Sequence, residues 1–438
     1  MYTVLEKERV TVIFATTIGI ILGIVSGLIP GVGNFVLMLL VWPFLGSFGI
    51  VELLLMYTAM ASISQYIGSV PAIVYGIPGE SSSYPAVAES KRLTSVKQVS
   101  QAISGSALGS AVGSLLVVGL CWVFVDYTDM IKYFYNTKIL VALLVTVTLV
   151  MIFTVNNRWY VNVLLIAGGL LLGLIGYNSY LGIKFATFDN MYLYAGLPMP
   201  VVLICLFAIP QMLHHFNDDV SKGLAKSYEL GRIYVLNPLA MLGSTLIGFV
   251  GGLIPGLTTV FSSTAAYNVS MLFTRDPVKR IVVSETANNA GAFSMLLPLL
   301  IFGVPLIGSE AILLFLMEQK GFNLVQFKFS DFLPTLAAGL VVVNLVGFLL
   351  AWPLSRAVPF FYKFNLKIVM SLLIVMLFCV TLYTGYTNYS TAYYVICFAV
   401  LAPIGVMLRN VDTLPLVFAF IIHNKLIDGT FRLYQLIQ

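Results

Sequence analysis

The sequence has few charged residues for its length. Only 9% of its 438 residues are Asp, Glu, Lys or Arg, whereas 59% are hydrophobic, and the mean hydropathy is +0.98. Soluble globular domains carry about 25% charged residues. This shortage of charge excludes a soluble enzyme or a soluble binding module, and it predicts an integral membrane protein.

Residue types that build catalytic or metal centres are also scarce. The chain has three histidines, none of them in a group with carboxylates inside an apolar run, so neither a metal centre nor an enzyme is expected. The cysteines lie inside apolar runs without a CxxC pair, which is typical of small core residues: Cys121, Cys205, Cys379 and Cys397. No basic cluster with interleaved aromatic residues is present, so we do not expect a nucleic-acid partner.

The sequence contains long runs without any charged residue. The two longest are equal in length and cover residues 10–51 and 233–274. A helix of that length would cross a bilayer about twice, because one crossing needs about 20 apolar residues. Together the runs predict an all-α integral membrane protein with about 10–12 membrane segments, including re-entrant or broken helical hairpins. The first apolar run is too long for a cleaved signal peptide.

A short sequence repeats within the two longest runs. "GLIPG" stands at residues 27–31 and again at 252–256, and a Pro-x4-Gly-x-Pro pattern follows each copy, at 71–78 and 298–305. The spacing between the proline of "GLIPG" and the last proline of the second pattern is nearly the same in both halves. We therefore expect two structural repeats, residues 8–215 and 233–438, joined by a polar cytoplasmic linker at 216–232.

The distribution of lysine and arginine bears on the orientation of the repeats. If the repeats are inverted and the linker is cytoplasmic, 14 of the 23 basic residues fall on the inside. Parallel repeats would leave no such bias. The positive-inside rule therefore favours inverted repeats, although Lys7 and Arg9 at the N-terminus argue against this arrangement.

The duplicated Pro-Gly breaks predict a binding site. A single break in a membrane helix is usually a packing kink, but breaks at corresponding positions of two halves are typical of transporter sites. Broken helices expose N–H groups that suit an anion and carbonyl groups that suit a cation. Irregular backbone at membrane depth is tolerated only where protein or a water-filled cavity covers it.

Polar residues beside the breaks are the predicted ligands. The expected substrate-binding residues are Gly31, Gly33, Asn34, Pro78, Gly79, Ser81, Ser82, Ser83, Gly256, Thr258 and Thr259. The expected cation-binding residues, for a Na+ ion, are Asn288, Asn289, Gly303 and Ser262. The two asparagines could instead join helices by hydrogen bonds, and Glu80 could bind a cation or proton or simply mark an exposed motif edge. Glu285 and Glu310 flank an apolar run and are expected at the membrane interface.

These motifs occur in an order that resembles a known family. "GLIPGVGN", "YGIPGESSS", "GGLIPGLTT" and "SETANNAGA…FGVP" resemble the large membrane subunit of the tripartite tricarboxylate transporters, and weaker similarity continues over nearly the whole chain. The chain departs from the family pattern at Thr258, at Leu306 and at Glu89-Ser90. These departures leave the transporter class intact and the substrate open.

The resemblance implies a secondary transporter that imports a small carboxylate with a sodium or proton gradient. It further implies a small four-helix membrane subunit, an extracytoplasmic substrate-binding protein, a bacterial inner-membrane location, and no cofactor besides the coupling ion. The alternative is a non-transporting membrane scaffold or lipid-handling subunit. That alternative explains the hydrophobicity, but it does not explain polar breaks that repeat in register.

Overall fold

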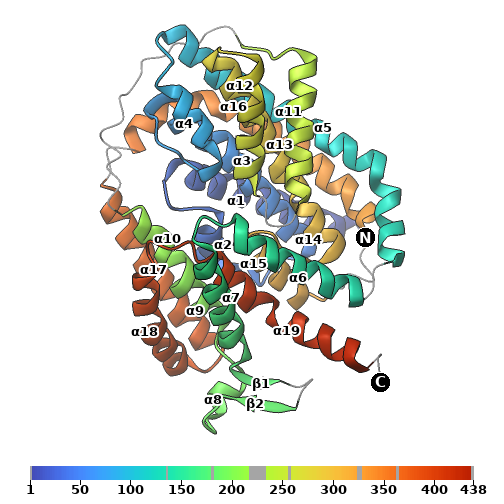
Figure 1. Cartoon of the computed structure of the whole chain (residues 1–438), viewed down its shortest axis with the longest axis vertical. Helices are drawn as coiled ribbons and strands as arrows, with labels where there is room; N and C mark the ends of the chain where they lie inside the picture. Colours follow the sequence, from blue (N-terminus) through green and yellow to red (C-terminus); the bar gives the residue numbers. More distant parts are fainter. Residues whose placement is uncertain are drawn as a thin grey trace.

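The computed structural model describes residues 2–134, 137–178, 182–216, 233–254, 258–322, 328–361 and 365–435. Helices make up nearly all of it (Figure 1). Among the described residues, seven helices are long and apolar enough to cross a membrane, and five shorter apolar helices accompany them. The predicted all-α membrane architecture is therefore confirmed at this level.

The first half of the chain contains four of the seven membrane-length helices of the described residues. Its elements are α1 (Tyr2–Leu28), α2 (Asn34–Leu45), α3 (Ile50–Tyr75), the 3₁₀ helix η1 (Ser81–Ser83), α4 (Tyr84–Ser90), α5 (Val96–Phe134), α6 (Thr137–Thr154), α7 (Trp159–Leu174), β1 (Gly176–Asn178), β2 (Ile183–Phe185), α8 (Met191–Tyr194), α9 (Met199–Leu203), the π-helix η2 (Ile204–Ala208) and α10 (Ile209–His214).

The second half repeats a similar order of long and interrupted helices. Its elements are α11 (Pro238–Leu253), α12 (Thr259–Phe273), α13 (Pro277–Ser294), α14 (Leu296–Phe302), α15 (Gly308–Gln319), α16 (Phe329–Phe361), α17 (Leu366–Thr387), α18 (Thr391–Met407) and α19 (Leu414–Gln435). All but the first residue of the predicted linker, and the second Pro-Gly at 255–256, lie outside the described residues.

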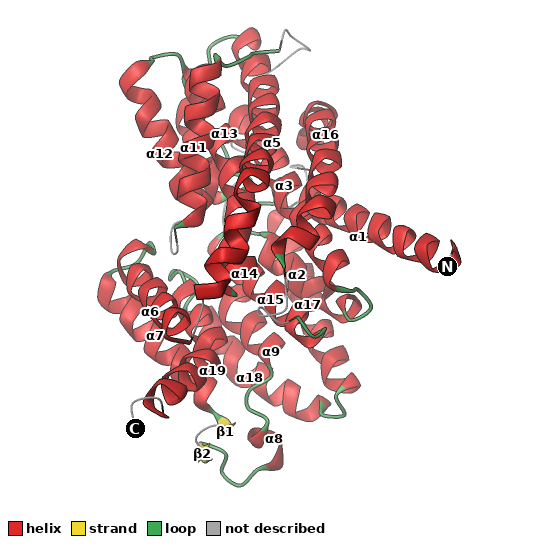
Figure 2. Cartoon of the chain, turned by 90° about the vertical axis from the view of Figure 1, so that its right-hand side faces the viewer, coloured by secondary structure: helices red, strands yellow, loops and turns green. Residues whose placement is uncertain are grey.

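A two-stranded hairpin departs from the predicted all-α fold. Strands β1 and β2 pair antiparallel, with Gly176 opposite Phe185. Each strand is too short for a recognisable alternation in the sequence. The hairpin and α8 lie together at one end of the molecule (Figures 1 and 2).

The two halves pack their first helices in equivalent ways. In α1, a Cβ added to Gly23 would lie 2.7 Å from the Met60 carbonyl oxygen on α3. In α11, at the corresponding place of the second half, a Cβ on Gly248 would overlap the carbonyl oxygen of Ala287 on α13. The same correspondence holds one helical turn later in both pairs. Glycine permits this close approach because it lacks a Cβ.

Both Pro-x4-Gly-x-Pro motifs fold into the same helix end. Gly76 caps α3 at φ +68° and ψ 28°, and Gly303 caps α14 at φ +63° and ψ 28°. Each glycine amide donates to the carbonyl four residues earlier, and the next amide donates to the carbonyl of the first proline of the motif. The bond from the glycine amide is that of an αL helix cap, whose left-handed residue favours glycine.

Helix α13 lies within a group of helices at one end of the molecule. Helices α11, α12, α13 and α5 occupy one end of the molecule, and α6, α7, α9, α18 and α19 lie toward the other (Figure 2). Helix α13 packs against α3, α5, α11 and α12. It is therefore enclosed by protein on several sides, although it carries several polar residues.

Candidate functional site

The segment Gly76–Ser83, here named tip one, passes through a narrow gap beside its own repeat. A Cβ on Gly79 would overlap the carbonyl oxygen of Gly27 and lie 2.6 Å from the Cα of Gly68. Glycine at position 79 therefore lets the chain pass between α1 and α3. The predicted residue Pro78 lies within this segment and is partly buried.

Tip one also contacts the second half of the chain. The Ser263 hydroxyl on α12 donates to the carbonyl oxygen of Ser82 over 2.7 Å, and the Ser82 hydroxyl donates to Gln65 Oε1 over 3.1 Å. Ser82 and Ser263 are both buried. The predicted residue Thr259 lies one turn before Ser263, and Thr258 caps α12 by accepting the amide of Val260. The structure thus brings the serines of tip one to the start of α12.

Helix α13 presents buried polar side chains to this contact. Glu285, Asn288 and Asn289 are at most 1% exposed. Asn288 Nδ2 donates to Glu285 Oε2 over 3.3 Å, and Asn289 Nδ2 donates to Ser110 Oγ of α5 over 2.7 Å. Ser83 of tip one lies next to the Glu285 carboxyl.

Glu285 and Glu310, which were expected at the membrane interface, are enclosed by protein. Both are buried, at 0% and 1% exposure. Glu285 is buried because its helix is enclosed by α3, α5, α11 and α12. Glu310 is buried because it folds back over the start of α15, where its Oε2 accepts the amide of Leu306 over 2.7 Å. Each carboxyl therefore lies in the protein interior, where a polar group has a strong need for a partner.

Four oxygen atoms at this contact lack a partner. Among the described residues, none donates to Ser83 Oγ, Glu285 Oε1, Asn288 Oδ1 or Asn289 Oδ1, although each atom is buried. We name these four residues the acceptor cluster. Leaving a buried polar atom unpaired costs about 1–3 kcal/mol, and such atoms are rare in native proteins. Each of the four can accept a hydrogen bond or bind a cation.

The first Pro-Gly hairpin reaches the same region through α3. Gly31 adopts φ +78° and lies against His215, and the Asn34 amide donates to the Ser64 hydroxyl over 3.2 Å. Ser64 precedes Gln65, the residue that accepts the Ser82 hydroxyl. Gly33 lies beside the side chain of Gln211 on α10.

The other predicted ligands lie elsewhere or outside the described residues. Ser262 donates to the carbonyl of Gly248 over 3.4 Å, so its hydroxyl joins α12 to α11. Gly303 is followed by Val304, which packs in an apolar cluster of α6 and α19 side chains rather than beside α13. Gly256 lies outside the described residues, as does the side chain of Ser81.

Several functional contacts were not predicted from the sequence. Ser64 and Gln65 were overlooked, although polar residues inside a long apolar run are a usable signal. A second omission is Glu89, which is 1% exposed and accepts from Arg92 over 2.7 Å and from Arg280 over 2.9 Å. The Tyr267 hydroxyl also donates to it over 2.9 Å. Glu89 therefore ties α4, which follows tip one, to α12 and α13.

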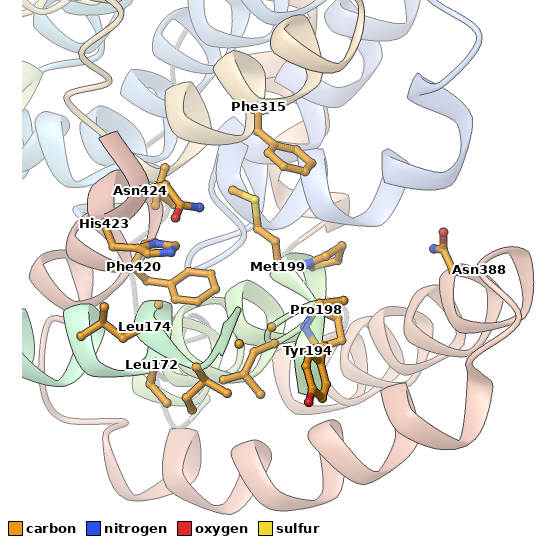
Figure 3. Close-up of a pocket in the computed structure, with 18 of the residues that line it drawn as sticks. Leu172, Leu174, Tyr194, Pro198, Met199, Phe315, Asn388, Phe420, His423 and Asn424 are labelled. Carbon is orange, nitrogen blue, oxygen red and sulfur yellow. The ribbon is translucent and has the colours of Figure 1, made fainter. Parts of the chain in front are cut away.

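A separate cavity of about 950 Å³ opens near tip two, the segment Gly303–Glu310. Figure 3 shows Phe420, His423 and Asn424 of α19 on one side of it, with Met199 and Tyr194 among the residues lining the rest. Its lining is mainly apolar and aromatic, and includes the Lys425–Glu318 ion pair of 2.7 Å. It reaches Pro305 of tip two, and no residue of the acceptor cluster is part of its described lining.

Comparison with known proteins places this architecture in a family. The profile of the tripartite tricarboxylate transporter TctA family matches residues 13–418. An uncharacterized 52.8 kDa protein in the TAR-I ttuC' 3' region of Agrobacterium vitis is 26% identical over 66% of this chain. The match covers 60% of that relative, so this chain aligns with less than two thirds of its length.

A second relative aligns over a larger share of both chains. An uncharacterized protein of Methanocaldococcus jannaschii is 22% identical over 90% of this chain and 93% of its own length. No solved structure gives a significant match. The profile covers more than nine tenths of the chain and includes every paired motif, from the first Pro-Gly hairpin to tip two. The chain is a multi-pass membrane protein that belongs to the tripartite tricarboxylate transporter TctA family.

Proposed function

We propose that this protein is the large membrane subunit of a binding-protein-dependent transporter, and that it carries a small carboxylate across the membrane with a cation gradient. One observation supports this most: tip one of the first repeat meets α12 and α13 of the second at a buried contact rich in hydroxyl, amide and carboxyl groups. Polar groups of this kind inside a membrane protein usually mark a substrate or ion pathway.

The side chains at the contact suit a carboxylate ligand and a cation together. The Ser83 hydroxyl can donate to an anion, and the oxygen atoms of the acceptor cluster can take a cation. Binding the two together would limit the net charge buried in the membrane. Family membership supports the choice of a carboxylate.

The remaining parts of the transport system are also proposals. A small four-helix membrane subunit and an extracytoplasmic binding protein would complete the tripartite system, in a bacterial inner membrane. Inverted repeats would place tip one and tip two on opposite sides of a central site. The equivalent packing of α1 on α3 and of α11 on α13 supports two repeats.

Uptake into proteoliposomes tests the proposal. The protein would be reconstituted with its membrane partner and its binding protein, and radiolabelled di- and tricarboxylates would be offered under an imposed Na+ or proton gradient. We expect accumulation that stops when the gradient is collapsed. Absence of gradient-dependent accumulation for every carboxylate tested would favour a scaffold or lipid-handling role instead.

A further inference from the structure

We propose that the acceptor cluster is a binding site for one monovalent metal cation of the Na+ class, with Glu285 as its charged ligand. The inference deepens the proposed function and rests on it, because it names the group through which the cation gradient would act. It assigns to Glu285 a role that the sequence did not suggest.

The hydrogen bonds around the cluster leave several oxygen atoms without a donor. Each asparagine directs one N–H of its amide to a neighbour, Asn288 to Glu285 and Asn289 to Ser110. Ser110 in turn directs its hydroxyl at the carbonyl oxygen of Glu285 over 3.4 Å. What remains is one carboxylate oxygen, two amide oxygens and the Ser83 hydroxyl oxygen, all without a donor among the described residues.

This donor set selects the charge and type of ligand. An anion is excluded because a carboxylate and two amide oxygens would repel it. A proton on Glu285 could pair that carboxyl with one neighbouring oxygen and would leave the other two unpaired, whereas a metal cation can bind several oxygens at once. The single carboxylate of the cluster balances one positive charge, which favours a monovalent ion in a buried site. A second carboxyl, Glu80, lies beside Ser64 and Ser82 and is near enough to repel the charge on Glu285, which a cation at the cluster would offset.

The cluster also joins the two repeats. Ser83 belongs to tip one, and the other three residues belong to α13. A cation held by both would fix tip one against the second repeat. Such an ion could bias the tip between a docked and an undocked position, because it binds more tightly to the docked arrangement.

Tip two has no equivalent site. Counting from Gly303, Glu310 takes the place that Ser83 has after Gly76, and it binds the amide of Leu306 in its own tip. On α3, the positions equivalent to Glu285, Asn288 and Asn289 are Thr58, Ala61 and Ser62. The structure therefore assigns one cation site to the described chain, between tip one and α13.

Thermal unfolding of the purified protein tests this assignment directly. The unfolding temperature would be measured against NaCl, with choline chloride holding ionic strength constant, for the wild-type protein, Glu285→Gln and Glu310→Gln. Glu310→Gln is the matched control, because Glu310 is equally buried but lies in tip two. We expect saturable stabilisation by Na+ in the wild type and in Glu310→Gln.

In Glu285→Gln, the Na+ concentration for half-maximal stabilisation should rise by at least about tenfold, since even outer-shell partners of metal ligands have effects of that size. An unchanged Na+ response in Glu285→Gln would overturn the proposal, as would equal responses of the wild type to NaCl and choline chloride. If Glu285→Gln does not fold, Asn288→Ala and Ser83→Ala should show the same loss of response.

Parallel uptake measurements separate this inference from the proposed function. Carboxylate uptake that persists in a protein with no Na+-specific stabilisation would reject the cation site and leave the transport function standing. Saturable Na+ stabilisation without uptake under any gradient would reject the transport function and leave the cation site standing.

Discussion

The two tips begin with the same backbone and end in different chemistry. Both start with a left-handed glycine and reach a proline two residues later. Tip one then presents serines to the polar side of α12 and α13. In tip two, Gly308 lies against the ring of Phe35, and the Ser309 hydroxyl is 3.1 Å from that of Tyr57.

This difference separates what the repeated motif sets from what the side chains around it add. The repeated Pro-x4-Gly-x-Pro motif sets where each helix ends, because proline and glycine act locally on the backbone. The ligands depend on the side chains that follow and on the helix they meet. Tip two holds its own carboxylate, Glu310, whereas tip one leaves Ser83 and the α13 oxygens unpartnered within the described chain.

The largest effect is expected for Gly79→Ala, which would prevent tip one from packing. A methyl group at this position overlaps the Gly27 carbonyl and the Gly68 backbone, and neither can move without separating α1 from α3. We expect no monodisperse protein on size-exclusion chromatography. Gly119→Ala is the control, because its added Cβ would meet nothing within 4 Å. A Gly79→Ala protein that purifies and transports normally would contradict the claim that only glycine at position 79 lets tip one pass between α1 and α3.

Removal of Glu89 should be the next largest effect. Glu89→Ala leaves Arg280, which is 11% exposed, without its carboxylate, and breaking a buried pair in this way costs about 3–5 kcal/mol. The free energy of unfolding would be measured by SDS titration in mixed micelles. Glu318→Ala breaks the more exposed Lys425 pair and should cost about 0–1 kcal/mol. Equal costs for the two variants would contradict the role of Glu89 in holding α4 to the second repeat.

Substitutions at the tip-one contact should affect transport more than stability. Ser82→Ala removes the bond to Gln65, and Asn288→Ala removes the bond to Glu285 and one open oxygen. We expect uptake to fall by about tenfold in each, the effect of about 1.4 kcal/mol, with normal yield. Ser309→Ala, the counterpart of Ser82 in tip two, should retain most of its uptake. Loss of uptake in Ser309→Ala alone would reverse the assignment of the two tips.

The sequence predicted the local features better than the distant contacts. The breaks and their duplication were readable because Pro and Gly determine backbone geometry within a few residues. The burial of Glu285 was not readable, because it depends on four helices from both halves that enclose α13. Glu89 was missed for a similar reason, since its partner Arg280 lies 191 residues away. Ser262 was placed at the site by its position near a break, but its hydroxyl faces α11.

The central claim is that substrate and cation meet at tip one and not at tip two. The most direct test is the rate of thiol labelling of Ser82→Cys and Ser309→Cys, each in a background without the four native cysteines. The claim predicts that Na+ and a transported carboxylate together slow labelling at position 82 and leave position 309 unchanged. Protection at position 309 with none at position 82 would contradict it.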